Sequence, residues 1–327
     1  MADRDPVKDL AEEGDDLYDI ATWEQRTRLD RVAVTVHSLV LRAAWTVVVL
    51  SAVLILVGIG GLSALVDPQV GILTLLSAIP AFGLAAYVYV SDPTNAEPLR
   101  LLVATYLLGI LTASFAAVLN SMLRPVFGPL GFLGMAVFFF VVVGPVEESV
   151  KLLAVRLYAY GTDSFNCVVD GAVYGAMAGL GFATIENSIF IARQVGDIGM
   201  DVGLATLIGA GGSITAVRAL AGPGHVIYSA LAGYYLGLAK FNPGTRGPIV
   251  IKGLLIAAFV HATYNSTVGI GSGLIATVLG VPPLVGFLGY VLVYDTLWGL
   301  FLLRKIRRYT STFNRLRTGT ASRNDRG

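Results

Sequence analysis

The sequence predicts an all-α polytopic membrane protein of about eight transmembrane helices, with a polar site in the core of the helix bundle. Of its 327 residues, 55% are hydrophobic and only 14% are charged, and the mean hydropathy is +0.72. Soluble domains contain about 25% charged residues. In addition, the apolar residues are grouped in runs near the ~20 residues that a bilayer requires. Finally, carboxylates and an ammonium interrupt one of these runs without a polar spacer.

Nine apolar runs can be distinguished, separated by Pro, Gly and Asp clusters that predict turns. They are roughly 43–66, 70–90, 99–120, 130–155, 168–192, 200–221, 224–240, 248–269 and 282–303. The run 200–221 is the weakest, because it is rich in Gly, Ser and Thr and carries Arg218. It is predicted to be short, tilted or re-entrant, which leaves about eight crossings.

The charge distribution predicts that both termini are cytoplasmic. Several arginines precede the first run, and the last 24 residues hold 8 of the 23 bases but one acid, a pattern typical of cytoplasmic segments. We therefore predict an acidic, partly amphipathic cytoplasmic tail at 1–42, a transmembrane protease-like domain at 43–303 and a basic cytoplasmic tail at 304–327. The polar N-terminus does not resemble a signal peptide, so the first span is expected to direct insertion into the cell membrane.

The most informative polar cluster follows the apolar residues 130–143 directly. Glu147 and Glu148 lie four and three residues before Lys151, so on a helix the lysine can face both acids. A charge at the centre of a span costs about 2.5–3.5 kcal/mol, so three of them require a function or a structural partner. Two adjacent carboxylates suit a general acid or base. The alternative is a buried structural ion pair.

A second cluster lies on the predicted helix 168–192. Three glycines are spaced by four and predict a groove in which another helix packs closely; they are Gly171, Gly175 and Gly179. Asp170 and Tyr174 lie one turn apart on the same face, so a hydrogen bond between their side chains is possible. Glu186 follows four apolar turns and is predicted to be deep in the bundle, either as a functional carboxylate or as a hydrogen-bonded link between helices.

Two histidines complete the set of polar side chains within the spans. His225 begins a run after Gly222-Pro223-Gly224, where it could also be interfacial, and His261 lies in the middle of a run. Asn265 lies one turn after His261 on the same face. Outside these clusters, Cys167 is the single cysteine, so an intrachain disulfide is excluded and we expect an inert thiol.

Together these side chains could form a catalytic metal site. Two histidines and one glutamate, with water as the fourth ligand, make a complete catalytic zinc set. A further glutamate can then take a proton from the water, and Asn265 can donate to a developing oxyanion. The sequence contains no His-Glu-x-x-His and no Gly-x-Ser-x-Gly pattern, so the ligands would have to come from separate helices.

At these residues the sequence resembles the PrsW family of intramembrane metalloproteases, which belongs to the wider group of CAAX prenyl proteases and bacteriocin-immunity (Abi) proteins. The first motif, Glu-Glu-x-x-Lys, is matched by Glu147, Glu148 and Lys151. The second, Phe-x-x-x-Glu-Asn, is matched by Phe182, Glu186 and Asn187, after a similar-looking Asp-Gly-x-x-Tyr-Gly at Asp170 to Gly175. The histidine motifs resemble His225 and His261 with Asn265. The resemblance covers roughly residues 80–303.

The resemblance implies a helical membrane protein that cleaves peptide bonds of membrane-associated proteins, with Zn²⁺ as cofactor. It implies Glu186, His225 and His261 as metal ligands, Glu147 as general base, and Glu148 as an assisting or ligating carboxylate. Lys151 would neutralise the glutamates, and Asn265 would stabilise the oxyanion. In CAAX relatives the second motif ends in histidine, where this chain has Glu186.

Two other functions fit the same residues. Intramembrane Glu, Asp, His and Lys also build the proton relays of proton-coupled transporters. A non-catalytic scaffold or immunity-type membrane protein would keep the fold without the reaction. A bound metal would separate the protease from the transporter. The predicted partners are a membrane protein or peptide substrate and the lipid bilayer, and no nucleic-acid motif is present. The sequence does not indicate an oligomeric state.

Overall fold

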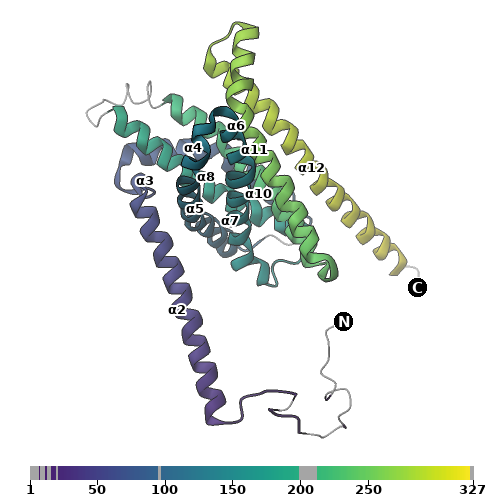
Figure 1. Cartoon of the computed structure of the whole chain (residues 1–327). Helices are drawn as coiled ribbons and strands as arrows, with labels where there is room; N and C mark the ends of the chain where they lie inside the picture. Colours follow the sequence, from purple (N-terminus) through teal and green to yellow (C-terminus); the bar gives the residue numbers. More distant parts are fainter. Residues whose placement is uncertain are drawn as a thin grey trace. The chain divides into compact units, whose positions relative to one another are not determined.

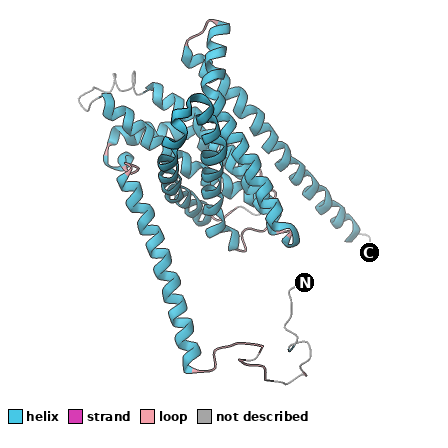
Figure 2. Ribbon diagram, viewed as in Figure 1, coloured by secondary structure: helices cyan, strands magenta, loops and turns pink. Residues whose placement is uncertain are grey.

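The computed structural model describes residues 21–94, 97–198 and 212–324, together with residues 7, 12 and 16–19. Within these ranges the chain is built of helices and contains no strand, apart from an isolated bridge between Tyr18 and Thr22 (Figure 2). This confirms the predicted all-α class. The helices are α2 (Arg28–Gly58), α3 (Ser63–Val66), α4 (Pro68–Val90), α5 (Leu99–Phe127), α6 (Gly131–Phe138), α7 (Gly144–Leu157), α8 (Val168–Ile198), α10 (Gly212–Lys240), α11 (Arg246–Leu279) and α12 (Pro283–Asn324) (Figure 1).

Six helical stretches of the described ranges are long and apolar enough to cross a membrane. One of them, Leu99–Gly161, contains 63 residues and includes α5, which packs against α7 after a turn at Gly128–Leu130. α10 is not among the six. The chain is thus a multi-pass membrane protein by these criteria, while the predicted number of eight crossings is not confirmed.

α10 corrects one prediction about the apolar runs. Residues 212–240 form one continuous helix, although Gly222-Pro223-Gly224 was expected to separate two runs. Proline is tolerated inside membrane helices because neighbouring helices and side chains satisfy the freed backbone groups. The earlier part of run 200–221 lies outside the described residues.

The chain divides into two compact units, Met1–Ser51 and Ala52–Gly327. In the first unit, a capping box starts α2: the Asp30 carboxylate accepts the Thr27 backbone N–H at 2.6 Å, and the Thr27 hydroxyl accepts the Asp30 N–H at 3.1 Å. Within the partly amphipathic tail predicted at 1–42, the described residues from 16 to 27 are not helical, and α2 begins at Arg28. α2 and α12 run through positions 42 and 303, and the three-part division remains a prediction.

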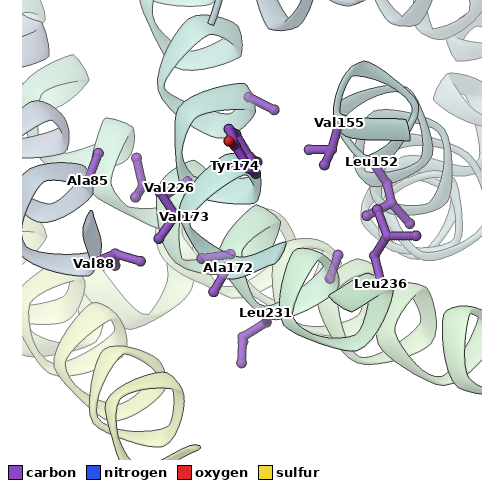
Figure 3. Close-up of a cluster of buried hydrophobic side chains, with 14 of the residues drawn as sticks. Ala85, Val88, Leu152, Val155, Ala172, Val173, Tyr174, Val226, Leu231 and Leu236 are labelled. Atoms are coloured by element: carbon purple, nitrogen blue, oxygen red, sulfur yellow. The ribbon is translucent and has the colours of Figure 1, made fainter. Parts of the chain in front are cut away.

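In the second unit α8 is the central helix. In its most apolar stretch 89% of the residues are buried, against at most 33% in the other candidate spans. It packs against α4, α5 and α10. Aliphatic side chains and Tyr174 from α4, α7, α8 and α10 form the main buried cluster around it (Figure 3).

The predicted glycine groove on α8 is confirmed, and its partner is α10. A Cβ atom added at Gly175 would lie 2.3 Å from the Ser229 carbonyl oxygen, and one at Gly179 would lie 2.5 Å from the His225 oxygen. The contact is reciprocal, because a Cβ at Gly233 would lie 2.0 Å from the Gly171 oxygen. Backbone-to-backbone packing of this kind fixes His225 at a definite height along α8.

A π-helical turn precedes the acidic motif. Residues Phe139–Val143 join α6 to α7, and the Gly144 N–H bonds to the Phe139 oxygen, five residues back. Pro145 explains this turn, since it lacks an N–H and its ring would clash with the carbonyl four residues earlier in a regular α-helix. Gly144 also permits close approach of α11, because a Cβ there would lie 2.6 Å from the Ala258 oxygen.

These contacts predict opposite effects of the same substitution at two glycines of α8. Gly175→Ala should destabilise the protein by about 1–3 kcal/mol, because the methyl group overpacks against the α10 backbone. Gly196→Ala is the control, since nothing lies within 4 Å of a Cβ at that position, and it should leave stability unchanged or raise it by less than about 1 kcal/mol. Thermal unfolding in detergent measures both. Equal unfolding temperatures for the two variants would contradict the close α8–α10 contact.

Candidate metal centre

The sequence-predicted residues gather around one cavity of about 420 Å³. It lies among α5, α7, α8, α10 and α11. Its lining includes Glu147, Glu186, His225, His261 and Asn265, together with Asn120, Arg218, Tyr228 and Tyr264. Side chains from runs far apart in the sequence therefore face a common space.

α7 contributes the charged motif, and its helical spacing directs all three side chains inward. The ammonium of Lys151 lies 2.8 Å from a Glu148 oxygen and 3.8 Å from a Glu147 oxygen. Lys151 and Glu148 are completely buried, and Glu147 is 5% exposed. The lysine thus faces both acids, and its charge stabilises two carboxylates that would be very costly to bury without a partner.

α11 contributes His261, whose two nitrogens face different glutamates. Nδ1 lies 2.8 Å from Glu148 Oε1, and Nε2 lies 3.7 Å from Glu147 Oε2. A hydrogen bond from Nδ1 to a carboxylate fixes the ring orientation and leaves Nε2 as the nitrogen available to a metal. Glu148 therefore holds His261, while Glu147 and His261 Nε2 face each other.

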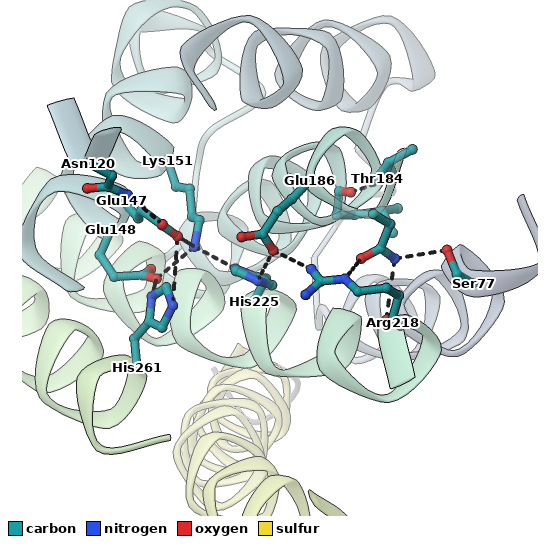
Figure 4. A network of polar contacts seen from close by, with 12 residues as sticks. Ser77, Asn120, Glu147, Glu148, Lys151, Thr184, Glu186, Arg218, His225 and His261 are labelled. Carbon is teal, nitrogen blue, oxygen red and sulfur yellow. Dashed lines mark hydrogen bonds and ion pairs between the residues drawn. The ribbon is translucent and has the colours of Figure 1, made fainter. Parts of the chain in front are cut away.

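α10 contributes His225 at the point where it touches Gly179. Its ring stands at 83° to the His261 ring, with the centroids 5.2 Å apart. Its Nδ1 lies 2.9 Å from the Lys151 ammonium and its Nε2 lies 3.0 Å from Glu186 Oε2 (Figure 4). His225 thus links the α7 motif to Glu186 of α8.

Glu186 differs from the other acids, because it is bound to Arg218, a residue that belongs to none of the sequence motifs described above. Arg218 of α10 donates through Nη2 to Glu186 Oε2, and its Nε donates to the Asn187 amide oxygen at 2.7 Å. Glu186 is also more open, with 26% of its side chain exposed. It contacts His225 and Arg218, whereas Glu147 is the acid that lies near both histidines.

The structure brings Glu147, His225 and His261 together as buried side chains that could hold a metal ion. One ligand atom from each lies within 4.8 Å of the other two. Glu147 Oε2 is buried and has no hydrogen-bond partner. An orphaned carboxylate oxygen beside two imidazoles is the donor set that a catalytic zinc ion takes, so these residues fit the metal.

Two side chains that bind the glutamates of the site were not assigned from the sequence. Asn120 of α5 donates to Glu147 Oε1 at 3.0 Å and so orients its other oxygen toward the histidines. Arg218 entered the sequence prediction only as a charge that makes the apolar run 200–221 weaker. A lone arginine in such a run is itself a signal for a buried acidic partner, but nothing in the sequence indicated that the partner is Glu186.

Fold and site together define a multi-pass helical membrane protein with a buried Glu/His/His group suited to a catalytic metal. The sequence model of the "PrsW family intramembrane metalloprotease" matches residues 97–296, which is more than half of the chain. The chain therefore belongs to this family, and it is an enzyme, an intramembrane protease.

Curated relatives agree with the family match. The chain is similar to "Protease PrsW" of Geobacillus kaustophilus, with 29% identity over 199 residues, or 59% of this chain and 78% of the relative. It is also similar to "Protease PrsW" of Bacillus subtilis, with 28% identity over 190 residues, or 57% and 78% of the two chains. No solved structure matches significantly.

The buried charge pair yields a prediction about stability. Lys151→Met should destabilise the protein by about 3–5 kcal/mol, because Glu148 is left as a buried carboxylate without its cation. The double variant Glu148→Gln, Lys151→Met removes both charges and should recover part of that loss. Thermal unfolding of the detergent-solubilised variants measures the difference. If the double variant is as unstable as the single one, the pair is not the source of the loss.

Proposed function

We propose that the chain is a zinc-dependent endopeptidase that hydrolyses peptide bonds of membrane-associated proteins. The observation that carries this proposal is the convergence of Glu147, His225 and His261 on one cavity in a member of the PrsW family. The placement in the wider CAAX protease and Abi group and the cytoplasmic position of both termini remain predictions of the sequence.

The distances favour His225, His261 and Glu147 as the residues that hold the metal. Glu147 has the free, buried oxygen next to His261 Nε2, whereas Glu186 is bound to Arg218. This proposal exchanges the roles that the sequence suggested for Glu147 and Glu186. Glu148 contacts His261 Nδ1 and Lys151, so it acts on the orientation of the imidazole.

A bound zinc ion supplies Lewis-acid chemistry, polarising a carbonyl and acidifying a water molecule. Glu186 lines the same cavity and is partly exposed, so it can accept the proton from the attacking water and return it to the leaving amine. Arg218 donates to this carboxylate and so fixes its position. Asn265, which also lines the cavity, can donate its amide N–H to the developing oxyanion.

Two glutamine variants test this assignment. Glu147→Gln should lose the zinc ion of this centre and all detectable activity, since it removes a ligand. Glu186→Gln should keep its zinc but lose about 10²–10⁴-fold in kcat, because it removes only proton transfer. Metal content is measured by elemental analysis of purified protein. Cleavage is measured by mass spectrometry in vesicles that contain the enzyme together with single-span membrane proteins. The opposite pattern, zinc lost only in Glu186→Gln, would support the sequence-based assignment.

Removal of the metal distinguishes the protease from the transporter. Stripping zinc with a chelator should abolish cleavage in vesicles, and added Zn²⁺ should restore it, since the buried ligand set can be refilled. Protein that carries out proton-coupled flux after complete stripping would instead be a transporter. Wild-type protein that holds zinc but cleaves the offered membrane proteins no better than a His261→Ala control would indicate the non-catalytic alternative.

A further inference from the structure

A second group of acidic and sulfur ligands lies at the start of α8, away from the cavity. One ligand atom each from Asp92, Cys167 and Asp170 lies within 4.8 Å of the other two. Cys167 Sγ is 2.7 Å from Asp170 Oδ1 and 3.7 Å from Asp92 Oδ1. Gly179, which contacts His225, is nine residues or about 14 Å farther along α8. The two groups are thus separate.

Glu97 places a third carboxyl near this group. It is 4% exposed, and its carboxyl interacts electrostatically with those of Asp170 and Asp92. Tyr174 donates to Glu97 Oε2, in place of the Asp170–Tyr174 hydrogen bond that the sequence suggested. The other oxygen, Glu97 Oε1, is buried without a hydrogen-bond partner, and so is Asp92 Oδ2.

Within the described part of the chain, the hydrogen bonds of the nearby Lys240 go to backbone oxygens and not to these carboxyls. Lys240 donates to the backbone oxygens of Tyr160, Thr162 and Phe165, at 2.7–3.2 Å. These three bonds use all three of its N–H groups. The carboxyls of Glu97 and Asp170 are buried and that of Asp92 is half-buried. Glu97 Oε1 and Asp92 Oδ2 have no hydrogen-bond donor, an arrangement that a bound cation would stabilise.

We propose that Asp92, Cys167 and Asp170 hold a structural zinc ion that joins the loop before α5 to the loop before α8, with the buried carboxyl of Glu97 near Asp170. Zinc–ligand bonds of about 2.0–2.3 Å place the donor atoms of one ion roughly 3–4 Å apart, close to the distances present here. A set of thiolate and carboxylates suits Zn²⁺ and does not suit Mg²⁺ or Ca²⁺, which take oxygen ligands alone. Binding releases the thiol proton, which the Cys167 S–H now donates to Asp170.

Neighbouring groups already hold the ligands in place. Asp170 Oδ2 accepts the backbone N–H groups of Asn166 and Cys167 at 2.6 and 2.8 Å, which leaves Oδ1 toward the sulfur. Thr94 donates its N–H and hydroxyl to Asp92 Oδ1, which leaves Oδ2 free. Supporting bonds of this kind are typical of metal sites. This zinc would stabilise the fold without taking part in peptide cleavage.

The single cysteine makes this site separable from the candidate metal centre by spectroscopy. The full-length protein in detergent is stripped of metal and titrated with Co²⁺. Because the sequence holds one cysteine, any thiolate-to-cobalt charge-transfer band reports Cys167 alone. We expect this band in the wild type and in His261→Ala, and we expect its loss in Cys167→Ser and a strong reduction in Asp92→Asn.

Zinc content and unfolding give a second measurement on the same variants. The wild type should bind about two zinc ions per chain, and Cys167→Ser and His261→Ala about one each. Added zinc should raise the unfolding temperature of His261→Ala, through the site that this variant retains, and should not raise that of the double variant Cys167→Ser, His261→Ala. Absence of the charge-transfer band in cobalt-loaded wild type, or a Cys167→Ser variant with the zinc content of the wild type, would overturn the proposal.

Discussion

The burial of charge in an apolar bundle is the constraint on which this structure depends. Lys151 is fully enclosed, and its ammonium is shared between Glu148, Glu147 and His225. Burying any one of these charged groups without its partners would be strongly destabilising, so their burial is possible only when all of them contact one another. The set requires α7, α10 and α11 to meet, because each helix supplies one part of it. The contacts that hold these helices together are therefore the same ones that position the side chains of the candidate site. A substitution that disturbs the site is for this reason expected to affect the stability of the protein as well.

The glycines of α8 stabilise the helix bundle in a second way, by allowing close packing against α10. Apolar helices in a membrane gain little from the hydrophobic effect, and close backbone contact replaces it. Gly171, Gly175 and Gly179 let α10 approach until carbonyl oxygens occupy the space of the missing Cβ atoms. Such a contact has one register, because a shift along the helix would bring a larger side chain onto the groove. This explains how a histidine that follows a Gly-Pro-Gly sequence can still be placed accurately against residues of α7 and α8.

Local patterns in the sequence were sufficient for some of these features and not for others. The spacing of Glu147, Glu148 and Lys151 determined their mutual contacts, and the four-residue glycine spacing determined the groove, since both follow from helical periodicity. The pairing of Glu186 with Arg218 spans 32 residues and that of Glu97 with Tyr174 spans 77, and helical periodicity carries no information on such contacts. The break expected at Pro223 was wrong because turn signals learned from soluble proteins are weaker where a helix is enclosed by others. The boundaries of the tails and the individual catalytic roles are still predictions.

The π turn at Phe139–Val143 has a consequence for the way in which α6 and α7 are joined. A π turn amounts to one residue inserted into an α-helix, and each residue of an α-helix advances the winding by about 100°. Loss of a single residue from this segment would therefore rotate α6 by roughly a third of a turn relative to α7. α7 is anchored by its ionic contacts, so α6 would bear the whole rotation and bring Leu133 and Phe132, now exposed on its outer surface, toward its neighbours. The number of residues in this short segment thus determines the rotation of α6, whose outer surface is apolar, relative to the charged helix α7.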